Sequence, residues 1–139
     1  MTDMDERITS LQLAAAEATK SGDIQTALDH INDAWTIVEG RVYSDWQMRL
    51  ARNGVTIAHK GGDFAAARIW LARLRPFYDA PGDPDPTMEY IEASIDHDAG
   101  EADRAHARFA ALLKKWGKRP FREGDPRHLA FALAPHRPA

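Results

Sequence analysis

Residues 22–38 read GDIQTALDHINDAWTIV, and the same arrangement returns at residues 62–78 (GDFAAARIWLARLRPFY) and 100–116 (GEADRAHARFAALLKKW). In each copy a glycine and an acid precede apolar or aromatic residues at offsets 0, 3, 7, 10 and 14, counted from the second residue after the glycine. This spacing places all five side chains on one face of an α-helix. The glycines at 22, 62 and 100 lie 40 and then 38 residues apart, a period typical of stacked helical hairpins.

The segments between the copies supply a leading helix to each of them. We expect three antiparallel helical hairpins at about residues 5–39, 44–78 and 86–117, followed by a capping tail at 118–139 that holds one short helix. The glycines mark the turns, and the acid after each glycine suits the first turn of the next helix. No segment alternates apolar and polar residues as a strand would. The predicted fold class is therefore all-α.

Length and composition indicate one ordinary domain spanning residues 1–139. Residues 79–86 (DAPGDPDP) form the one long connection, either a rigid surface excursion or a hinge within the stack. No apolar run approaches the roughly 20 residues that span a bilayer, and the acidic N-terminus lacks a secretion signal. The chain has no cysteine, which excludes disulfides and thiolate metal sites. We expect a cytoplasmic protein that does not contact a membrane.

Charge is distributed in blocks along the chain. The formal charge is −6 over residues 1–40, +5 over 41–78, −8 over 79–101 and +6 over 102–139, which together make the net charge of −3. One interpretation is that oppositely charged neighbouring repeats attract each other. The other is that a basic strip recruits an acidic partner.

The repeated helices resemble the second helix of the tetratricopeptide repeat (TPR). That family places small and apolar residues at matching positions, which here hold Gly22, Ile24, Ala27, Ile31 and Ala34; Gly62, Phe64, Ala67, Leu71 and Leu74; and Gly100, Ala102, Ala105, Phe109 and Leu112. The resemblance covers roughly residues 5–117 and implies a right-handed, TPR-like solenoid. It departs from the family in repeat length, which is about 34 residues there, and in the leading helices. "TPR-like" is the description that these matches support.

The resemblance further implies that the leading helices line a concave, partner-binding surface. The corresponding positions here are Gln12, Arg49, Arg52, Asn53, Thr56, His59, Tyr90, Ser94 and His97. Arginine, asparagine, tyrosine and histidine side chains suit an acidic peptide or a carboxylate-bearing protein surface. Of the set with which the chaperone-binding subgroup grips a C-terminal carboxylate, only Asn53 is present. The alternative is that these are solvated polar residues on an exposed face.

A second candidate surface follows the last repeat. Lys115, Lys118, Arg119, Arg122 and Arg127 form a basic patch near aromatic residues. Such interleaving can hold a nucleic-acid backbone and its bases, although the sequence pI of about 6.0 is low for a dedicated nucleic-acid domain. The patch is also consistent with docking of an acidic protein, or with cations that stabilise a helix C-terminus.

Catalytic and metal motifs are not recognisable in the sequence. Phosphate-binding glycine loops, nucleophile elbows and zinc-binding histidine helices are missing. The trio Asp96-His97-Asp98 is the most suggestive, but adjacent residues on a helix point about 100° apart and so should not converge. The other histidines lack a partner at ligand spacing. We therefore predict no catalytic residue, cofactor or metal.

Together these features predict a non-catalytic protein-binding module. Short helical-repeat proteins, here with an Ala- and Arg-rich composition that suggests a bacterial source, often act as adaptors, secretion chaperones or toxin-neutralising immunity proteins. That step is an analogy from fold. The alternatives are a nucleic-acid-binding protein that uses the basic C-terminal region, and a small enzyme of unrecognised type. The sequence leaves the oligomeric state and the partner open.

Overall fold

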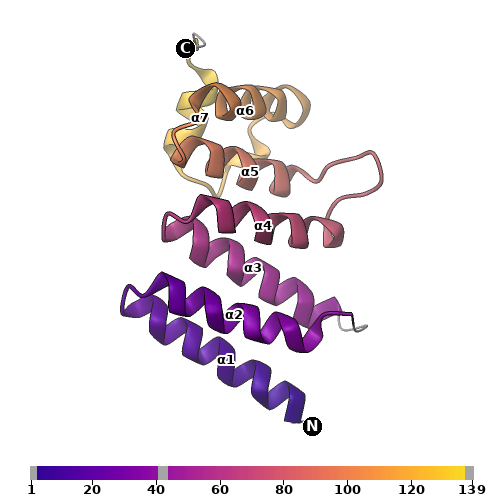
Figure 1. Ribbon diagram of the computed structural model, residues 1–139. Helices are drawn as coiled ribbons and strands as arrows, with labels where there is room; N and C mark the ends of the chain where they lie inside the picture. The colour runs from indigo at the N-terminus through magenta and orange to yellow at the C-terminus, as the bar shows by residue number, and fades with distance from the viewer. Residues whose placement is uncertain (1–2, 41–43, 137–139) are drawn as a thin grey trace. The chain divides into compact units, whose positions relative to one another are not determined.

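The computed structural model describes residues 3–40 and 44–136, and in these ranges the protein is all-α (Figure 1). The helices are α1 (Asp3–Lys20), α2 (Ile24–Val38), α3 (Ser44–Lys60), α4 (Phe64–Leu74), α5 (Pro86–Asp98), α6 (Ala102–Trp116) and α7 (Pro126–Leu133), with the 3-10 turns η1 (Arg75–Phe77) and η2 (Arg119–Phe121). Among these helices, none combines the length and the apolar character needed to cross a membrane. The all-α prediction is confirmed for the described residues.

The chain divides into two compact units. The N-terminal unit, Met1–Phe77, contains α1 to α4, and the C-terminal unit, Tyr78–Ala139, contains α5 to α7. The boundary falls directly before the proline-rich connection at residues 79–86. Within the units, α1 packs on α2, α3 on α4 and α5 on α6, which are the three pairs that the repeat predicts. A right-handed solenoid in one domain stays a prediction.

Each pair is joined by the same glycine turn. The amide after the glycine donates to the carbonyl five residues earlier, at 2.9 Å in all three turns. This bond requires a left-handed backbone at the glycine, which a side chain would disfavour. The φ angles are +78° at Gly22, +80° at Gly62 and +82° at Gly100.

The residue after the glycine begins the next helix. The Asp23 carboxylate accepts a hydrogen bond from the amide of Thr26 at 3.1 Å, and that of Asp63 accepts one from Ala66 at 3.1 Å. Both caps satisfy amides that have no partner within the helix. Glu101 makes no such bond and pairs with Arg104 instead. The predicted capping acids are therefore confirmed at two turns, whereas at the third turn the Glu101 side chain makes no capping hydrogen bond.

The repeated apolar face forms the core of each unit at its inner positions. The buried members are Ala27, Ile31, Ala34 and Val38 in α2, Ala67, Leu71 and Leu74 in α4, and Ala105, Phe109 and Leu112 in α6. The outer positions of the third repeat differ from the prediction, because Ala102 is exposed and Trp116 keeps 38% of its surface exposed, whereas Val38 at the outer position of the first repeat is buried. Trp116 is the last residue of α6, where the partner helix no longer covers it.

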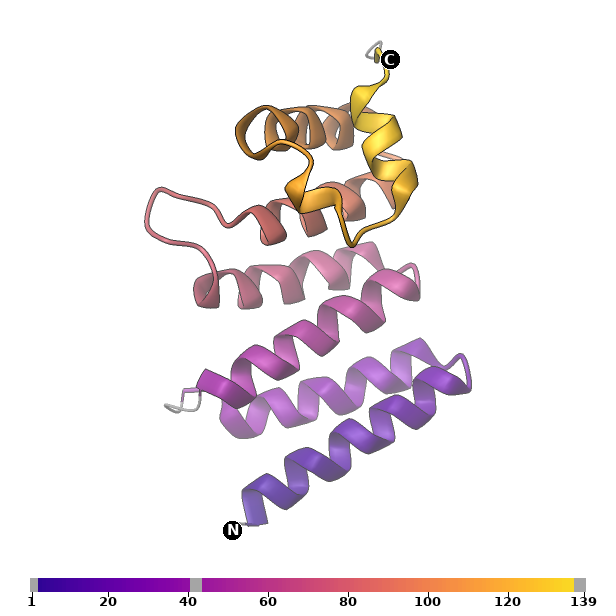
Figure 2. The same cartoon turned by 180° about the vertical axis from the view of Figure 1, so that it is seen from behind.

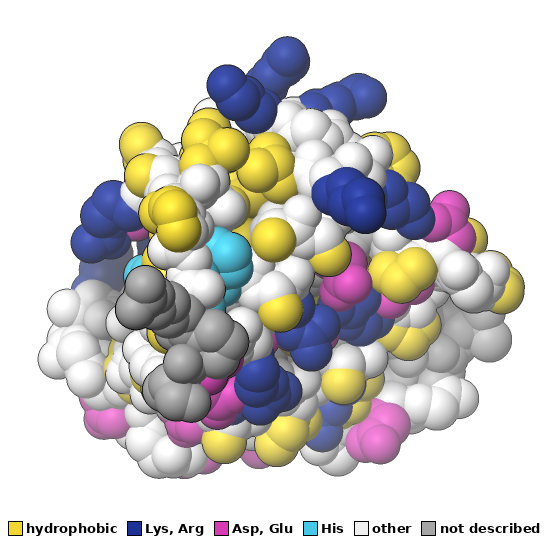
Figure 3. All heavy atoms as spheres, turned by 90° about the horizontal axis from the view of Figure 1, so that it is seen from above, with side chains coloured by type: hydrophobic (Ala, Val, Ile, Leu, Met, Phe, Trp, Pro, Cys, Tyr) yellow, Lys and Arg dark blue, Asp and Glu magenta, His cyan; other side chains and the backbone are white. Residues whose placement is uncertain are grey.

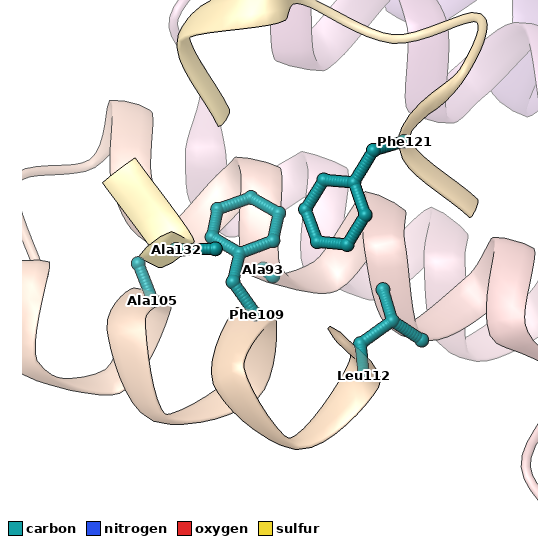
Figure 4. Packing of buried hydrophobic residues seen from close by; sticks show 6 residues of the cluster. All are labelled: Ala93, Ala105, Phe109, Leu112, Phe121 and Ala132. Carbon is teal, nitrogen blue, oxygen red and sulfur yellow. The ribbon is translucent and has the colours of Figure 1, made fainter. Parts of the chain in front are cut away.

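The tail after α6 folds back on α5 and α6. Phe121 of η2 and Ala132 of α7 join Ala93, Phe109 and Leu112 in one buried cluster (Figure 4). Figure 2 shows this segment passing across the α5–α6 pair before it ends in α7. The predicted short helix in the tail is confirmed. Leu133, the last residue of this helix, is 57% exposed.

Candidate functional site

The C-terminal unit contains a cleft of about 730 Å³ between the start of α5, the end of α6 and η2. The residues that determine its chemistry are Thr87, Tyr90, Trp116, Arg119, Arg122 and Glu123. Arg119, Arg122 and Trp116 are exposed, and Tyr90 is half-buried at the cleft wall. Two arginines and a tryptophan therefore line the same cleft.

Local sequence explains how this cleft is formed. Gly117 ends α6 with a φ of +67°, a backbone that directs the chain back towards α5. Phe121, which lies between the two arginines in the sequence, is 4% exposed and anchors η2 in the core. Gly124 then lies against Tyr90, so closely that a Cβ at this position would come within 1.9 Å of the phenol oxygen. Only glycine allows this approach without displacing the ring.

Carboxylates near the arginines limit the positive charge of the cleft. Asp85 caps α5 and accepts hydrogen bonds from the amides of Thr87 at 2.8 Å and Met88 at 3.3 Å. Its charge is thereby compensated by the helix N-terminus. Glu123 is exposed at the rim. The cleft is suited to a ligand that combines an acidic group for the arginines with an apolar group for the indole.

The residues of the predicted basic patch lie in different surroundings. Arg119 and Arg122 line the cleft, but the Lys115 ammonium lies 3.3 Å from an Asp83 carboxylate oxygen. Arg127 is held by Asp125, to which its Nε donates at 2.9 Å. This guanidinium holds the pKa of Asp125 well below its usual range. Lys118 is exposed but is not among the cleft residues.

A larger hollow of about 950 Å³ lies between α1 and α2 in the N-terminal unit. Its charged lining residues are Glu6, Arg7 and Asp33, and the described residues that line it include no aromatic side chain. It thus offers a mixed charge and no large apolar anchor. We consider the cleft of the C-terminal unit the better candidate because arginine and tryptophan dominate binding energies at protein interfaces.

The predicted site residues of the N-terminal unit remain accessible. Arg49, Arg52 and Thr56 are exposed along one face of α3, as their spacing predicts. The Arg49 guanidinium lies 5.5 Å from the centre of the Trp46 ring. The other predicted positions are half-buried: Gln12 on α1 and Asn53 and His59 on α3. Whether this face holds a partner stays a prediction.

In the C-terminal unit, the predicted open face of α5 is covered by the chain itself. Ser94 is 4% exposed, and its hydroxyl donates to the carbonyl of Tyr90 at 2.8 Å. The Tyr90 ring meets Phe121 at 5.5 Å, and the His97 ring meets Phe131 at 4.9 Å. Of the three predicted positions on α5, Ser94 is therefore buried, whereas Tyr90 lines the cleft and the side chain of His97 is 31% exposed. The reason is that η2 and α7 bury their own apolar side chains against this face.

His97 at the end of α5 and His128 in α7 are distant in the sequence, but their side chains meet in the structure. The Tyr90 hydroxyl lies 2.6 Å from Nδ1 of His128, whose ring stacks on Phe109 at 5.1 Å. The ring of His97 approaches that of His128 at 5.2 Å, and its Nδ1 lies 3.2 Å from an oxygen of Asp98. Burial raises the pKa of the Tyr90 phenol and lowers the pKa of the His128 imidazole. Figure 3, which views the protein from above, shows histidine (cyan) reaching the surface beside hydrophobic side chains.

This cluster corrects part of the sequence interpretation of Asp96-His97-Asp98. Asp96 diverges as expected, since it is fully buried and accepts a hydrogen bond from Nε of Arg108 at 2.9 Å. His97 and Asp98 do approach each other, at the end of α5. His128 completes the group from 30 residues further along, and helical spacing carries no signal of that contact.

Comparison with protein-family models, with curated proteins and with solved structures found no match. The fold and the site by themselves define an all-α protein of paired helices, with a cleft in its C-terminal unit that is lined by arginine and tryptophan.

Proposed function

We propose that the protein is a non-catalytic binding module that recognises an acidic segment of another protein in the cleft of its C-terminal unit. The observation that carries this proposal is that Arg119, Arg122 and the partly exposed Trp116 line the same cleft. Adaptor, chaperone and toxin-neutralising roles are all compatible with such a module.

Size and chemistry both support a short segment as the ligand. A volume of about 730 Å³ is in the range of pockets that enclose a few side chains. Guanidinium groups bind carboxylates through two parallel hydrogen bonds, which gives orientation as well as affinity. Because the indole of Trp116 is only partly covered, an apolar side chain of the ligand gains contact area there.

The exposed face of α3 is a second surface in this proposal. Arg49, Arg52 and Thr56 offer a similar combination of positive charge and hydrogen-bond donors, with Trp46 beneath Arg49. It lacks the enclosure of the cleft, so we expect it to contribute less binding energy. A partner long enough could use either surface or both.

Nucleic acid is the alternative ligand, because arginines and an aromatic ring also bind a phosphate backbone and its bases. Two features favour the acidic protein segment. The carboxylate of Glu123 stands at the cleft with the arginines, and the net charge of the chain is −3. Both would repel a continuous polyanion more than they repel a short peptide with one or two carboxylates.

The test measures fluorescence anisotropy with defined probes. A labelled peptide set in which two glutamates flank one phenylalanine is compared with the same set carrying glutamines, and with 12-nucleotide single-stranded oligonucleotides. Arg119→Glu/Arg122→Glu should weaken binding of the glutamate peptides at least tenfold, since each charge-assisted hydrogen bond contributes about 1.5–3 kcal/mol. Arg49→Glu/Arg52→Glu makes the same charge change on α3 and measures the smaller contribution that we expect from this second surface.

The outcomes separate the alternatives. Loss of binding in the α3 variant but not in the cleft variant would assign the site to α3. Tighter binding of the oligonucleotides, with an affinity that falls steeply with salt, would replace the protein-binding proposal by the nucleic-acid one. Equal affinity for glutamate and glutamine peptides would show that the arginines do not recognise acidic groups, and would refute the proposal.

A further inference from the structure

We propose that His97, Asp98 and His128 form a binding site for a divalent transition-metal ion, best matched by Zn²⁺. The three residues come from the end of α5 and from α7, and one potential ligand atom from each lies within 4.8 Å of the others. The sequence predicts no metal site, because the spacing of these residues shows no ligand motif. The proposal depends on tertiary contact and does not rest on the proposed protein-binding function, although Tyr90, which supports His128, also lines the cleft.

The donor set selects the kind of ion. Two imidazoles and one carboxylate are typical of zinc and of other first-row transition metals, whereas magnesium and calcium prefer oxygen ligands throughout. Tetrahedral Zn²⁺ with bonds of about 2.0–2.1 Å holds its ligand atoms roughly 3.3 Å apart. Nδ1 of His97 and the Asp98 oxygen already lie 3.2 Å apart. The other separations between ligand atoms, which are at most 4.8 Å, must shorten to about 3.3 Å when the ion binds.

The position of His128 resembles that of a supported metal ligand. Tyr90 occupies its Nδ1 at 2.6 Å, so Nε2 is the nitrogen that remains for the ion. A hydrogen bond from the second ring nitrogen orients metal-bound histidines and selects the tautomer. Stacking on Phe109 fixes the plane of the same ring. This pre-organised histidine is 8% exposed, and its geometry does not depend on a flexible surface rotamer.

The other two ligands provide access from solvent. The side chains of His97 and Asp98 are 31% and 43% exposed, so the ion can enter and both side chains can adjust. Asp98 is the last residue of α5, where the helix dipole favours a positive charge. With three protein ligands, a tetrahedral ion keeps a fourth position for water or for a donor from another molecule.

A second histidine pair in the same unit serves as an internal comparison. The rings of His106 and His136 stack at 4.8 Å, and Nε2 of His136 lies 2.7 Å from an Asp103 oxygen. Nε2 of His106, however, contacts the backbone carbonyl of Ala134 at 3.0 Å. The backbone therefore occupies this nitrogen, which does not point at a common ion position with His136 and Asp103. His106 is thus a matched control in residue type and in unit.

The experiment titrates the untagged, metal-free protein with Zn²⁺ alone by calorimetry. We expect one equivalent to bind, with an affinity at least tenfold weaker in His97→Gln and in Asp98→Asn and unchanged in His106→Gln. Both variants alter partly exposed residues, so their folding should be retained, and circular dichroism checks this. Tyr90→Phe should weaken binding about tenfold, the lower end of the range for an outer hydrogen-bond partner.

Spectroscopy tests the coordination itself. Co²⁺ in place of Zn²⁺ should give the intense visible absorption of a tetrahedral ion, and His97→Gln should abolish it. Mg²⁺ should give no heat of binding. Absence of saturable Zn²⁺ binding would overturn the proposal, as would equal affinities of His97→Gln and the wild type. Loss of binding in His106→Gln alone would overturn it as well, since the ion would then lie elsewhere.

Discussion

Replacing Gly54 by alanine should destabilise the N-terminal unit by about 2 kcal/mol, although glycine is a poor helix former. Gly54 lies inside α3, where alanine would normally stabilise by ~1 kcal/mol. A Cβ at this position would come within 2.3 Å of Cδ2 and 2.5 Å of Cγ of Trp70. The ring is 2% exposed and is held by Trp35 at 5.6 Å, so it has little room to move. Overpacking of this severity costs about 3 kcal/mol, which exceeds the gain in helix propensity.

Urea unfolding followed by circular dichroism measures the difference. Thr56→Ala, a substitution at an exposed position of the same helix, is the control, and it should leave the free energy of unfolding unchanged or raise it slightly. In a Trp70→Ala background, which lacks Cγ and Cδ2, most of the penalty of Gly54→Ala should disappear, and a double-mutant cycle reports the difference as a coupling free energy. If Gly54→Ala instead raises the free energy of unfolding by ~1 kcal/mol, the close packing of α3 on α4 inferred from this contact is wrong.

Two further predictions concern charged groups. Arg108→Gln should destabilise the C-terminal unit by about 3 kcal/mol, because it weakens the compensation of the fully buried Asp96 carboxylate, and thermal unfolding measures the loss. A change below ~0.5 kcal/mol would show that this ion pair is not structural. Hydrogen bonds from Thr26 lower the pKa of Asp23 from 3.8, so its capping contribution should be complete above that value and lost as pH falls through the lower folded pKa. The stability difference between wild type and Asp23→Ala should therefore shrink in acid, and a difference that is constant between pH 6 and pH 2 would contradict the assigned cap.

The local elements follow directly from the sequence. Glycine turns, capping acids and helical spacing act over fewer than ten residues, so a single repeat contains the information for its own hairpin. The inner positions of the repeated face are buried for the same reason, as Ala27 and Phe109 illustrate. At the ends of the helices this reasoning is weaker, because burial there depends on what the chain does next. Trp116 was expected in the core and instead lines the cleft.

The candidate sites depended on longer-range contacts. Sequence alone identified Arg119 and Arg122 as part of a basic patch, but it could not separate them from Lys115, which pairs with Asp83 from 32 residues earlier. The pairing of Arg127 with Asp125 is local. Sequence alone also placed Tyr90 on an open surface. Local helix propensity contains no information on contacts with residues some 30 positions away, and here side chains of the tail pack against α5.

The repeating pattern by itself determined that this chain is helical, where its turns fall and which inner faces are apolar, since these properties come from backbone geometry and local spacing. Tertiary structure alone decided what the tail covers, and thereby the cleft beside Trp116 and the meeting of His97 and Asp98 with His128. Both arise because η2 and α7 bury apolar surface against α5 and α6. That burial is non-directional and brings together residues that share no spacing in the sequence.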